Sequence, residues 1–118
     1  MRRTVLIVDD HADFLSAARA LLQAEGFEVV GEASSGLEAL GANDRLRPEV
    51  VLLDVRLPDL DGIAVAERLA SLDESPAVVL VSSRDASAYG ARLTAVPVCG
   101  FLAKSELSGD ALRQLLDT

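Results

Sequence analysis

Short, uninterrupted apolar runs separated by helix-length segments constrain this chain more than any other feature. Val5–Val8, Val50–Leu53 and Ala77–Val81 are such runs, and polar residues follow each of them. A strand without polar alternation is buried on both faces, which is typical of a parallel sheet covered by helices. The pattern therefore predicts an α/β fold.

Five strand–helix units fit the 118 residues as a single domain, residues 1–118. Right-handed crossovers between parallel strands predict an open, doubly wound, flavodoxin-like sheet with strand order 2-1-3-4-5. Ligands of such sheets bind beyond the carboxyl ends of the strands, so we look for function there. We expect strands at 5–8, 27–30, 50–53, 77–81 and 98–102, and helices at 13–25, 35–47, 63–72, 85–95 and 107–116.

Local signals support several helix ends and weaken one helix. Gly26 stands where a left-handed cap would end the first helix, and Ser35 with Glu38 forms a capping-box pattern for the second. The fourth helix is compositionally weak because Gly90 lies inside its expected range. Tyr89 in that helix fits a packing role and a functional role about equally well.

Charge and cysteine content narrow the classes of partner and compartment. With 11 basic and 19 acidic residues the formal net charge is −8, which opposes direct nucleic-acid binding by this chain. We expect a cytoplasmic protein without a membrane contact, because the sequence shows neither a signal pattern nor a membrane-spanning apolar stretch. The single cysteine, Cys99, is expected to be a small buried hydrophobe in the fifth strand.

Polar side chains with complementary chemistry follow the predicted strands at one edge of the sheet. Three carboxylates near one another need a cation or a bound proton, and an all-oxygen ligand set favours Mg²⁺ as the cation. A carboxylate can also attack phosphorus, while a hydroxyl and an ammonium bind the phosphoryl oxygens. The residues are Asp9 and Asp10 after the first strand, Asp54 after the third, Ser82 and Ser83 after the fourth, and Lys104 after the fifth.

Taken singly, each of these residues has an ordinary structural explanation. Aspartates at strand ends form turns and helix caps, and a surface lysine is usually only solvated. Lys104 is distinctive because all ten other basic residues are arginine, and a compact ammonium suits a phosphoryl oxygen. The convergence of the acids, Ser82 and Lys104 at one edge is what favours a functional site.

Across essentially its whole length the sequence resembles the receiver domain of two-component response regulators. The likeness rests on 8–10 (VDD), 54–62 (DVRLPDLDG), 82–83 (SS) and 100–104 (GFLAK). Segments 50–58 and 100–107 are most similar to the NarL/FixJ-like subfamily, many members of which carry a helix-turn-helix domain after the receiver.

The resemblance implies a phosphorelay switch and not an enzyme acting on other substrates. Asp54 would accept a phosphoryl group from a histidine kinase. Asp9, Asp10 and Asp54, with the Arg56 backbone carbonyl, would bind Mg²⁺, and Ser82 and Lys104 would bind phosphoryl oxygens. The surface of helix 4, strand 5 and helix 5 would then change for a downstream protein or effector domain, with phosphorylation-dependent homodimer formation as one open mode of output.

Departures from the family pattern affect the switch and the phosphoryl lifetime. Ser82 and Phe101 match the switch positions, but Phe101 has no hydroxyl and can report activation by burial alone. Ser105 replaces the proline that commonly follows the family's lysine. Arg56 and Arg84 stand where side chains border the phosphoryl group, and we hypothesise that they gate hydrolysis of the acyl phosphate.

Other classes of protein remain open at this point. A phosphohydrolase of the haloacid dehalogenase type also uses Mg²⁺ and an aspartate after a strand, but it needs a second aspartate where this chain has Arg56. A flavin- or nucleotide-binding module would share the architecture, yet no glycine-rich phosphate loop follows the first strand. A degenerate receiver that only binds other proteins would retain the acids and lose phosphotransfer.

Overall fold

A five-stranded parallel sheet forms the centre of the computed structural model, which describes residues 2–84 and 89–117. The strand order is β2-β1-β3-β4-β5, so the predicted doubly wound topology is confirmed. The strands are β1 (Thr4–Val8), β2 (Glu28–Ala33), β3 (Val50–Asp54), β4 (Ala77–Ser82) and β5 (Gly100–Ala103).

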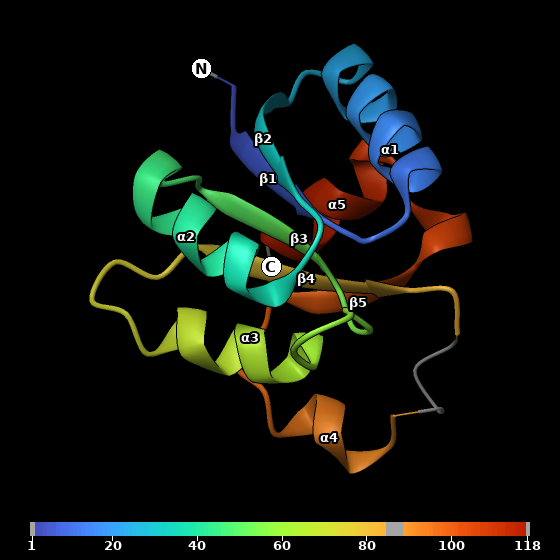
Figure 1. Ribbon diagram of the computed structural model, residues 1–118. Coiled ribbons are helices and arrows are strands. Elements are labelled where there is room, and N and C mark those ends of the chain that lie inside the picture. The colour runs from blue at the N-terminus through green and yellow to red at the C-terminus, as the bar shows by residue number, and fades with distance from the viewer. Residues whose placement is uncertain (1, 85–88, 118) are drawn as a thin grey trace.

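Helices cover both faces of the sheet, and two separate hydrophobic clusters result (Figure 1). α1 and α5 pack on the face that carries Val5, Ile7 and Leu52, whereas α2, α3 and α4 pack on the opposite face. β3 is buried along its whole length, and β1 and β4 are buried from their second residues on, because both faces are covered. The helices are α1 (Ala12–Ala24), α2 (Gly36–Leu46), α3 (Gly62–Ala70), α4 (Ala91–Thr94) and α5 (Gly109–Leu116), with a short 3-10 helix, η2 (Lys104–Glu106), after β5.

The predicted helix ends at Gly26 and Ser35 are confirmed. Gly26 has φ +96° directly after α1, a conformation that favours glycine. Ser35 is the N-cap of α2 and its hydroxyl accepts the Glu38 N–H at 3.1 Å, while the Glu38 carboxylate accepts the N–H of Ser34. The Ser35 contact satisfies an N–H group that the first turn of a helix leaves unpaired, and the Glu38 contact ties the preceding residue to the same turn.

The segment from 85 to 103 departs most from the sequence prediction. Residues 85–88 of the expected fourth helix lie outside the described residues, and α4 begins only at Ala91. Gly90 is the N-cap of α4 with φ +56°, so its placement inside a helix was wrong. Strand β5 begins at Gly100 instead of residue 98, because its pairing with β4 starts at Gly100 opposite Val79.

The expected burial of Cys99 was also wrong. Cys99 precedes β5 and its side chain is exposed. β5 is an edge strand, so a residue just before it has a neighbouring strand on one side only.

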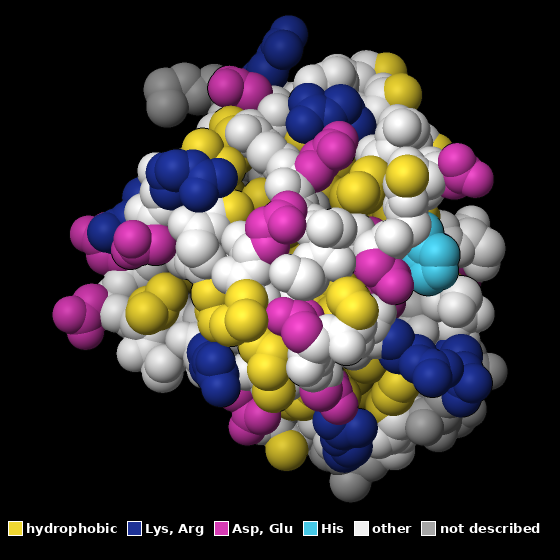
Figure 2. All heavy atoms as spheres, in the orientation of Figure 1, with side chains coloured by type: hydrophobic (Ala, Val, Ile, Leu, Met, Phe, Trp, Pro, Cys, Tyr) yellow, Lys and Arg dark blue, Asp and Glu magenta, His cyan; other side chains and the backbone are white. Residues whose placement is uncertain are grey.

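The surface mixes charges of both signs. Acidic and basic side chains are interspersed across the face in Figure 2, with groups of hydrophobic side chains between them. None of the helices within the described ranges has the length and hydrophobicity of a membrane span.

Candidate functional site

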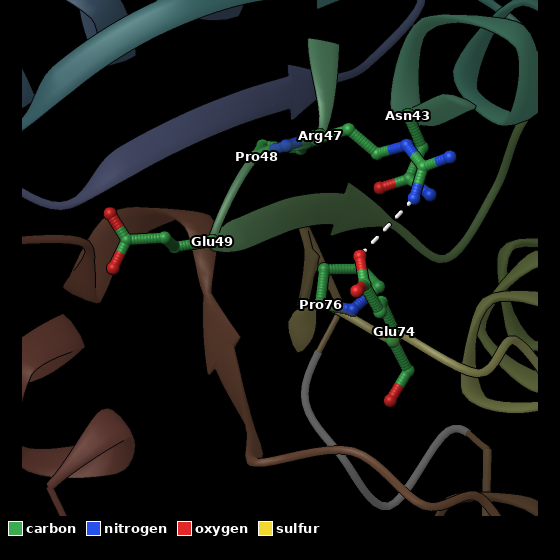
Figure 3. Close-up of a pocket in the computed structure, with 7 residues that line it drawn as sticks. Asn43, Arg47, Pro48, Glu49, Glu74 and Pro76 are labelled. Carbon is green, nitrogen blue, oxygen red and sulfur yellow. Dashed lines mark hydrogen bonds and ion pairs between the residues drawn. The ribbon is translucent and has the colours of Figure 1, made fainter. Parts of the chain in front are cut away.

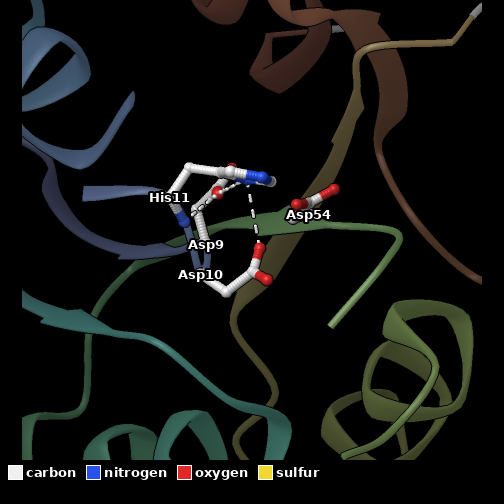
Figure 4. A group of neighbouring side chains, drawn as sticks. All are labelled: Asp9, Asp10, His11 and Asp54. Carbon is white, nitrogen blue, oxygen red and sulfur yellow. Dashed lines mark hydrogen bonds and ion pairs between the residues drawn. The ribbon is translucent and has the colours of Figure 1, made fainter. Parts of the chain in front are cut away.

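The predicted acidic residues meet at the carboxyl ends of two neighbouring strands. β1 pairs with β3 so that Val8 lies opposite Leu53, and Asp9 and Asp54 therefore leave the sheet side by side. Figure 4 shows Asp9, Asp10 and His11 close to Asp54. A ligand atom from each of these four side chains lies within 4.8 Å of those of the others.

The carboxylates of this cluster differ in solvent exposure. Asp9 is 0% exposed and Asp54 is 3% exposed, whereas Asp10 is exposed. Burying an ionised carboxylate is unfavourable unless it is paired or hydrogen-bonded. The two buried acids therefore need nearby donors and cations.

Lys104 supplies a positive charge to both buried acids. Its Nζ lies 2.6 Å from Asp9 Oδ2 and 3.4 Å from Asp54 Oδ2, and it stands 4.6 Å from the centre of the Phe14 ring. Burial lowers the pKa of Lys104, but its close contact with Asp9 and the charges of Asp54 and Asp9 outweigh burial and raise it. Lys104 is therefore an ammonium ion at physiological pH.

Asp54 is held between opposing influences. Burial, the largest of them, raises its pKa, and the charge of Asp9 acts in the same direction. The Arg56 N–H, which donates to Asp54 Oδ1 at 3.2 Å, and the Lys104 ammonium act against that rise. The net pKa is raised, so any further cation beside Asp54 favours its ionised, nucleophilic form.

His11 also belongs to this cluster. Its backbone N–H donates to Asp9 Oδ1 at 2.8 Å, and its ring Nδ1 lies 3.0 Å from Asp9 Oδ1 and 3.1 Å from Asp10 Oδ1. The His11 side chain is 67% exposed, so its ring lies at the solvent side of the cluster. Its position directly after the aspartate pair is the sequence signal for this contact.

The donor set suits a hard divalent cation. Asp9 Oδ2 is a buried oxygen without a hydrogen-bonding partner among the described residues, since its contact with Lys104 lacks hydrogen-bond geometry. With Asp10 and Asp54 it offers carboxylate oxygens of the kind that Mg²⁺ prefers. The Arg56 carbonyl stays a predicted ligand, and Arg56 lines the same cavity as Asp10 and Asp54, which is described below.

Ser82 ends β4 and is 1% exposed. Its Oγ accepts the Arg84 N–H at 3.0 Å and shares a 2.6 Å hydrogen bond with the Tyr89 hydroxyl. The Tyr89 ring also contacts the half-buried Phe101 ring, with 6.1 Å between ring centres. The bond from Tyr89 to Ser82 was not predicted, because no sequence pattern indicates a hydrogen bond between these two residues.

A cavity of about 420 Å³ opens over these side chains. It is lined by the predicted phosphoacceptor Asp54, by Asp10 and Arg56 of the predicted metal-binding set, and by both predicted phosphoryl-binding residues, Ser82 and Lys104. Arg84 contributes its N–H to Ser82 and is not among the described residues that border the cavity. The lining residues are Asp10, His11, Asp54, Arg56, Leu57, Pro58, Ser82, Ser83 and Lys104.

A second cavity, of about 330 Å³, lies beside the start of β3 and holds none of the predicted site residues. Arg47 and Glu74 face each other there at 3.4 Å (Figure 3). Its lining residues are Asn43, Arg47, Pro48, Glu49, Glu74, Ser75 and Pro76. The chemistry that the sequence predicts is thus confined to the cavity over Asp54.

Fold and site together define the class of a signalling receiver: a 2-1-3-4-5 parallel sheet with acids, a hydroxyl and an ammonium at its carboxyl edge. The chain belongs to the response regulator receiver domain family, because the sequence model of that family matches residues 5–117.

Relatives of known sequence and structure agree with this assignment. The positive alginate biosynthesis regulatory protein of Pseudomonas aeruginosa is 41% identical over 113 residues, which cover 94% of this chain and 45% of that protein. The virulence-factor transcription regulator BvgA of Bordetella pertussis is 37% identical over 106 residues, covering 90% of this chain and 51% of that protein. The signal receiver domain of NarL from Mycobacterium tuberculosis superposes with a TM-score of 0.85 at 33% identity, covering 98% and 94% of the two chains.

These relatives confirm the predicted NarL/FixJ-like subfamily and the class of signalling switch. The chain spans about half the length of the regulators that it matches.

Proposed function

We propose that Asp54 is the phosphoacceptor of a two-component phosphorelay, with a histidine kinase as donor and Mg²⁺ as cofactor. Asp54 is the buried acid that borders the cavity, and Lys104 stands 3.4 Å from one of its oxygens. That juxtaposition of a buried nucleophile and an ammonium is the observation that carries the proposal.

Phosphoryl transfer forms a bond between an Asp54 carboxylate oxygen and phosphorus, while the bond from phosphorus to the donor's histidine nitrogen breaks. Lys104 and the Ser82 hydroxyl then bind oxygens of the transferred group, and Asp9 keeps Lys104 charged and in place. Mg²⁺ held by Asp9, Asp10 and Asp54 would neutralise charge that builds up on the phosphoryl oxygens. Hydrolysis of the acyl phosphate by water would return Asp54 to its resting form.

The output follows from the position of Ser82 beside Tyr89 and Phe101. Movement of the Ser82 hydroxyl toward a phosphoryl oxygen changes the contacts of both rings and so the surface formed by α4, β5 and α5. We propose that the chain acts in the cytoplasm, with a histidine kinase and a downstream protein or effector domain as partners and homodimer formation as a further mode of output.

Treatment with acetyl phosphate and Mg²⁺ followed by intact-mass measurement tests the proposal. The wild type should gain the mass of one phosphoryl group, Asp54→Asn should not, and peptide mapping should place the group on Asp54. Asp13→Asn changes an exposed acid of α1 outside the cluster and serves as the matched control that keeps labelling. Labelling at another residue, or of Asp54→Asn, would refute it; an unlabelled wild type would favour a receiver that only binds proteins.

A further inference from the structure

We infer that Tyr89 is a positioning residue that fixes the Ser82 hydroxyl so that its proton is free for a phosphoryl oxygen. The inference rests on the proposed function of Asp54. It concerns the Tyr89 hydroxyl, which lies outside the cavity and contacts Ser82. Tyr89 is not among the described residues that line the cavity, and its hydrogen bond to Ser82 connects it to a residue that does.

The hydrogen-bonding capacity of Ser82 carries the argument. A serine hydroxyl has one proton to donate and two lone pairs that accept. The Arg84 N–H, which can only donate, uses one lone pair at 3.0 Å, and the Tyr89 hydroxyl lies 2.6 Å from the same oxygen.

Tyr89 is the better donor of the two hydroxyls. A phenol with a pKa near 10 is more acidic than an aliphatic hydroxyl, so the favoured arrangement has Tyr89 donating to Ser82. Both lone pairs of Ser82 are then occupied, and its own proton remains. A phosphoryl oxygen can only accept, so this arrangement prepares Ser82 for the one role it can take toward a phosphorylated Asp54.

Two neighbours hold Tyr89 in this position. Its ring packs against Phe101, at 6.1 Å between ring centres and an interplanar angle of 55°. Gly90 follows with φ +56° and ψ −137°, a backbone conformation that side chains other than glycine rarely adopt. The ring contact and the turn together direct the Tyr89 hydroxyl at β4 instead of solvent.

Tyr89→Phe removes the hydroxyl and keeps the ring, so it separates positioning from packing. We expect labelling of Asp54 by acetyl phosphate to slow by about twofold to tenfold, the kinetic equivalent of one hydrogen bond. The effect must pass through Ser82, so Tyr89→Phe should cause no further loss in a Ser82→Ala background. If Tyr89 only filled space, Tyr89→Phe would leave the labelling rate unchanged both in the wild type and in Ser82→Ala.

A second measurement follows the contact itself. Tyr89 is the one tyrosine of a chain without tryptophan, so near-ultraviolet absorbance reports its environment alone. We expect the tyrosine spectrum to shift in Ser82→Ala, whereas Ser71→Ala, which removes an exposed hydroxyl at the end of α3, should leave it unchanged. An unshifted spectrum in Ser82→Ala would refute the contact.

The outcomes separate this inference from the proposed function. If the wild type is labelled on Asp54 and Tyr89→Phe is labelled at the same rate or faster, the inference is refuted and the proposed function stands. A wild type that is never labelled would refute both.

Discussion

Gly62 lies so close to the phosphoacceptor strand that even one added methyl group should disturb the site. A Cβ at Gly62 would lie 2.1 Å from the Asp54 carbonyl oxygen and 2.7 Å from Val55 Cα, both of them backbone atoms that cannot rotate away. The Gly62 N–H also donates to the Val55 carbonyl at 2.7 Å. Gly62→Ala must therefore push α3 away from the end of β3.

The cost follows from these contacts. Overpacking costs about 1–3 kcal/mol, and a weakened backbone hydrogen bond adds about 1 kcal/mol, so unfolding free energy should fall by about 2–4 kcal/mol. Labelling of Asp54 by acetyl phosphate should slow as well, because the added Cβ presses on the Asp54 backbone at the end of β3 and so shifts the nucleophile. Urea unfolding followed by far-ultraviolet circular dichroism should show a midpoint lowered by about 1 M or more.

Gly41→Ala is the matched control for this substitution. Gly41 lies inside α2, and an added Cβ there would meet no atom within 4 Å. Alanine should instead stabilise the protein by about 0.5–1 kcal/mol, because it loses less backbone freedom on folding. Equal midpoints for Gly62→Ala and the wild type would show that the reasoning from the close approach is wrong.

Three further predictions follow from the site and its supports. Asp59 accepts the N–H groups of Leu37 and Gly36, which lower its pKa from the ordinary value of 3.8. The stabilising effect of Asp59 is therefore present above pH 3.8 and is lost as the pH falls through the folded-state pKa. Melting curves should give Asp59→Ala a lower melting temperature than the wild type at pH 7, and the two melting temperatures should converge in acid. Mg²⁺ at ten times its dissociation constant should add about 1.4 kcal/mol to the unfolding free energy, and Asp10→Asn should reduce this gain at the same Mg²⁺ concentration; identical gains in calorimetry would remove Asp10 from the ligand set. Finally, the phosphoprotein lifetime should change in Arg56→Asn or Arg84→Ala, and unchanged lifetimes in both would end the hypothesis that these arginines gate hydrolysis.

Strand periodicity alone predicts most of the fold and the location of the site. Buried apolar runs ending in Asp9, Asp54 and Ser82 require a parallel sheet, and a parallel sheet brings its carboxyl ends to one edge. Those acids, Ser82 and Lys104 were predicted for this reason, and the structure brings them together.

Contacts between distant segments could not be predicted from the sequence. Asp59 lies in the loop that follows β3 and caps α2, and no sequence pattern near either segment indicates this contact. The hydrogen bond between Tyr89 and Ser82 depends on the path of the chain around Gly90, which the helical interpretation of 85–95 obscured. Cys99 was misplaced because an apolar run does not reveal where pairing with the neighbouring strand begins.

Lys104 shares a single positive charge between Asp9 and Asp54 while Asp10 stands beside them, so these four ionised groups sum to −2. One dication balances that sum, and an attached phosphoryl group then makes it negative again. Metal binding and phosphorylation are consequently linked. If the bound ion raises the equilibrium constant for acyl-phosphate formation by some factor, phosphorylation raises the affinity for the ion by the same factor. The modified domain should thus retain its metal at concentrations where the resting domain has lost it.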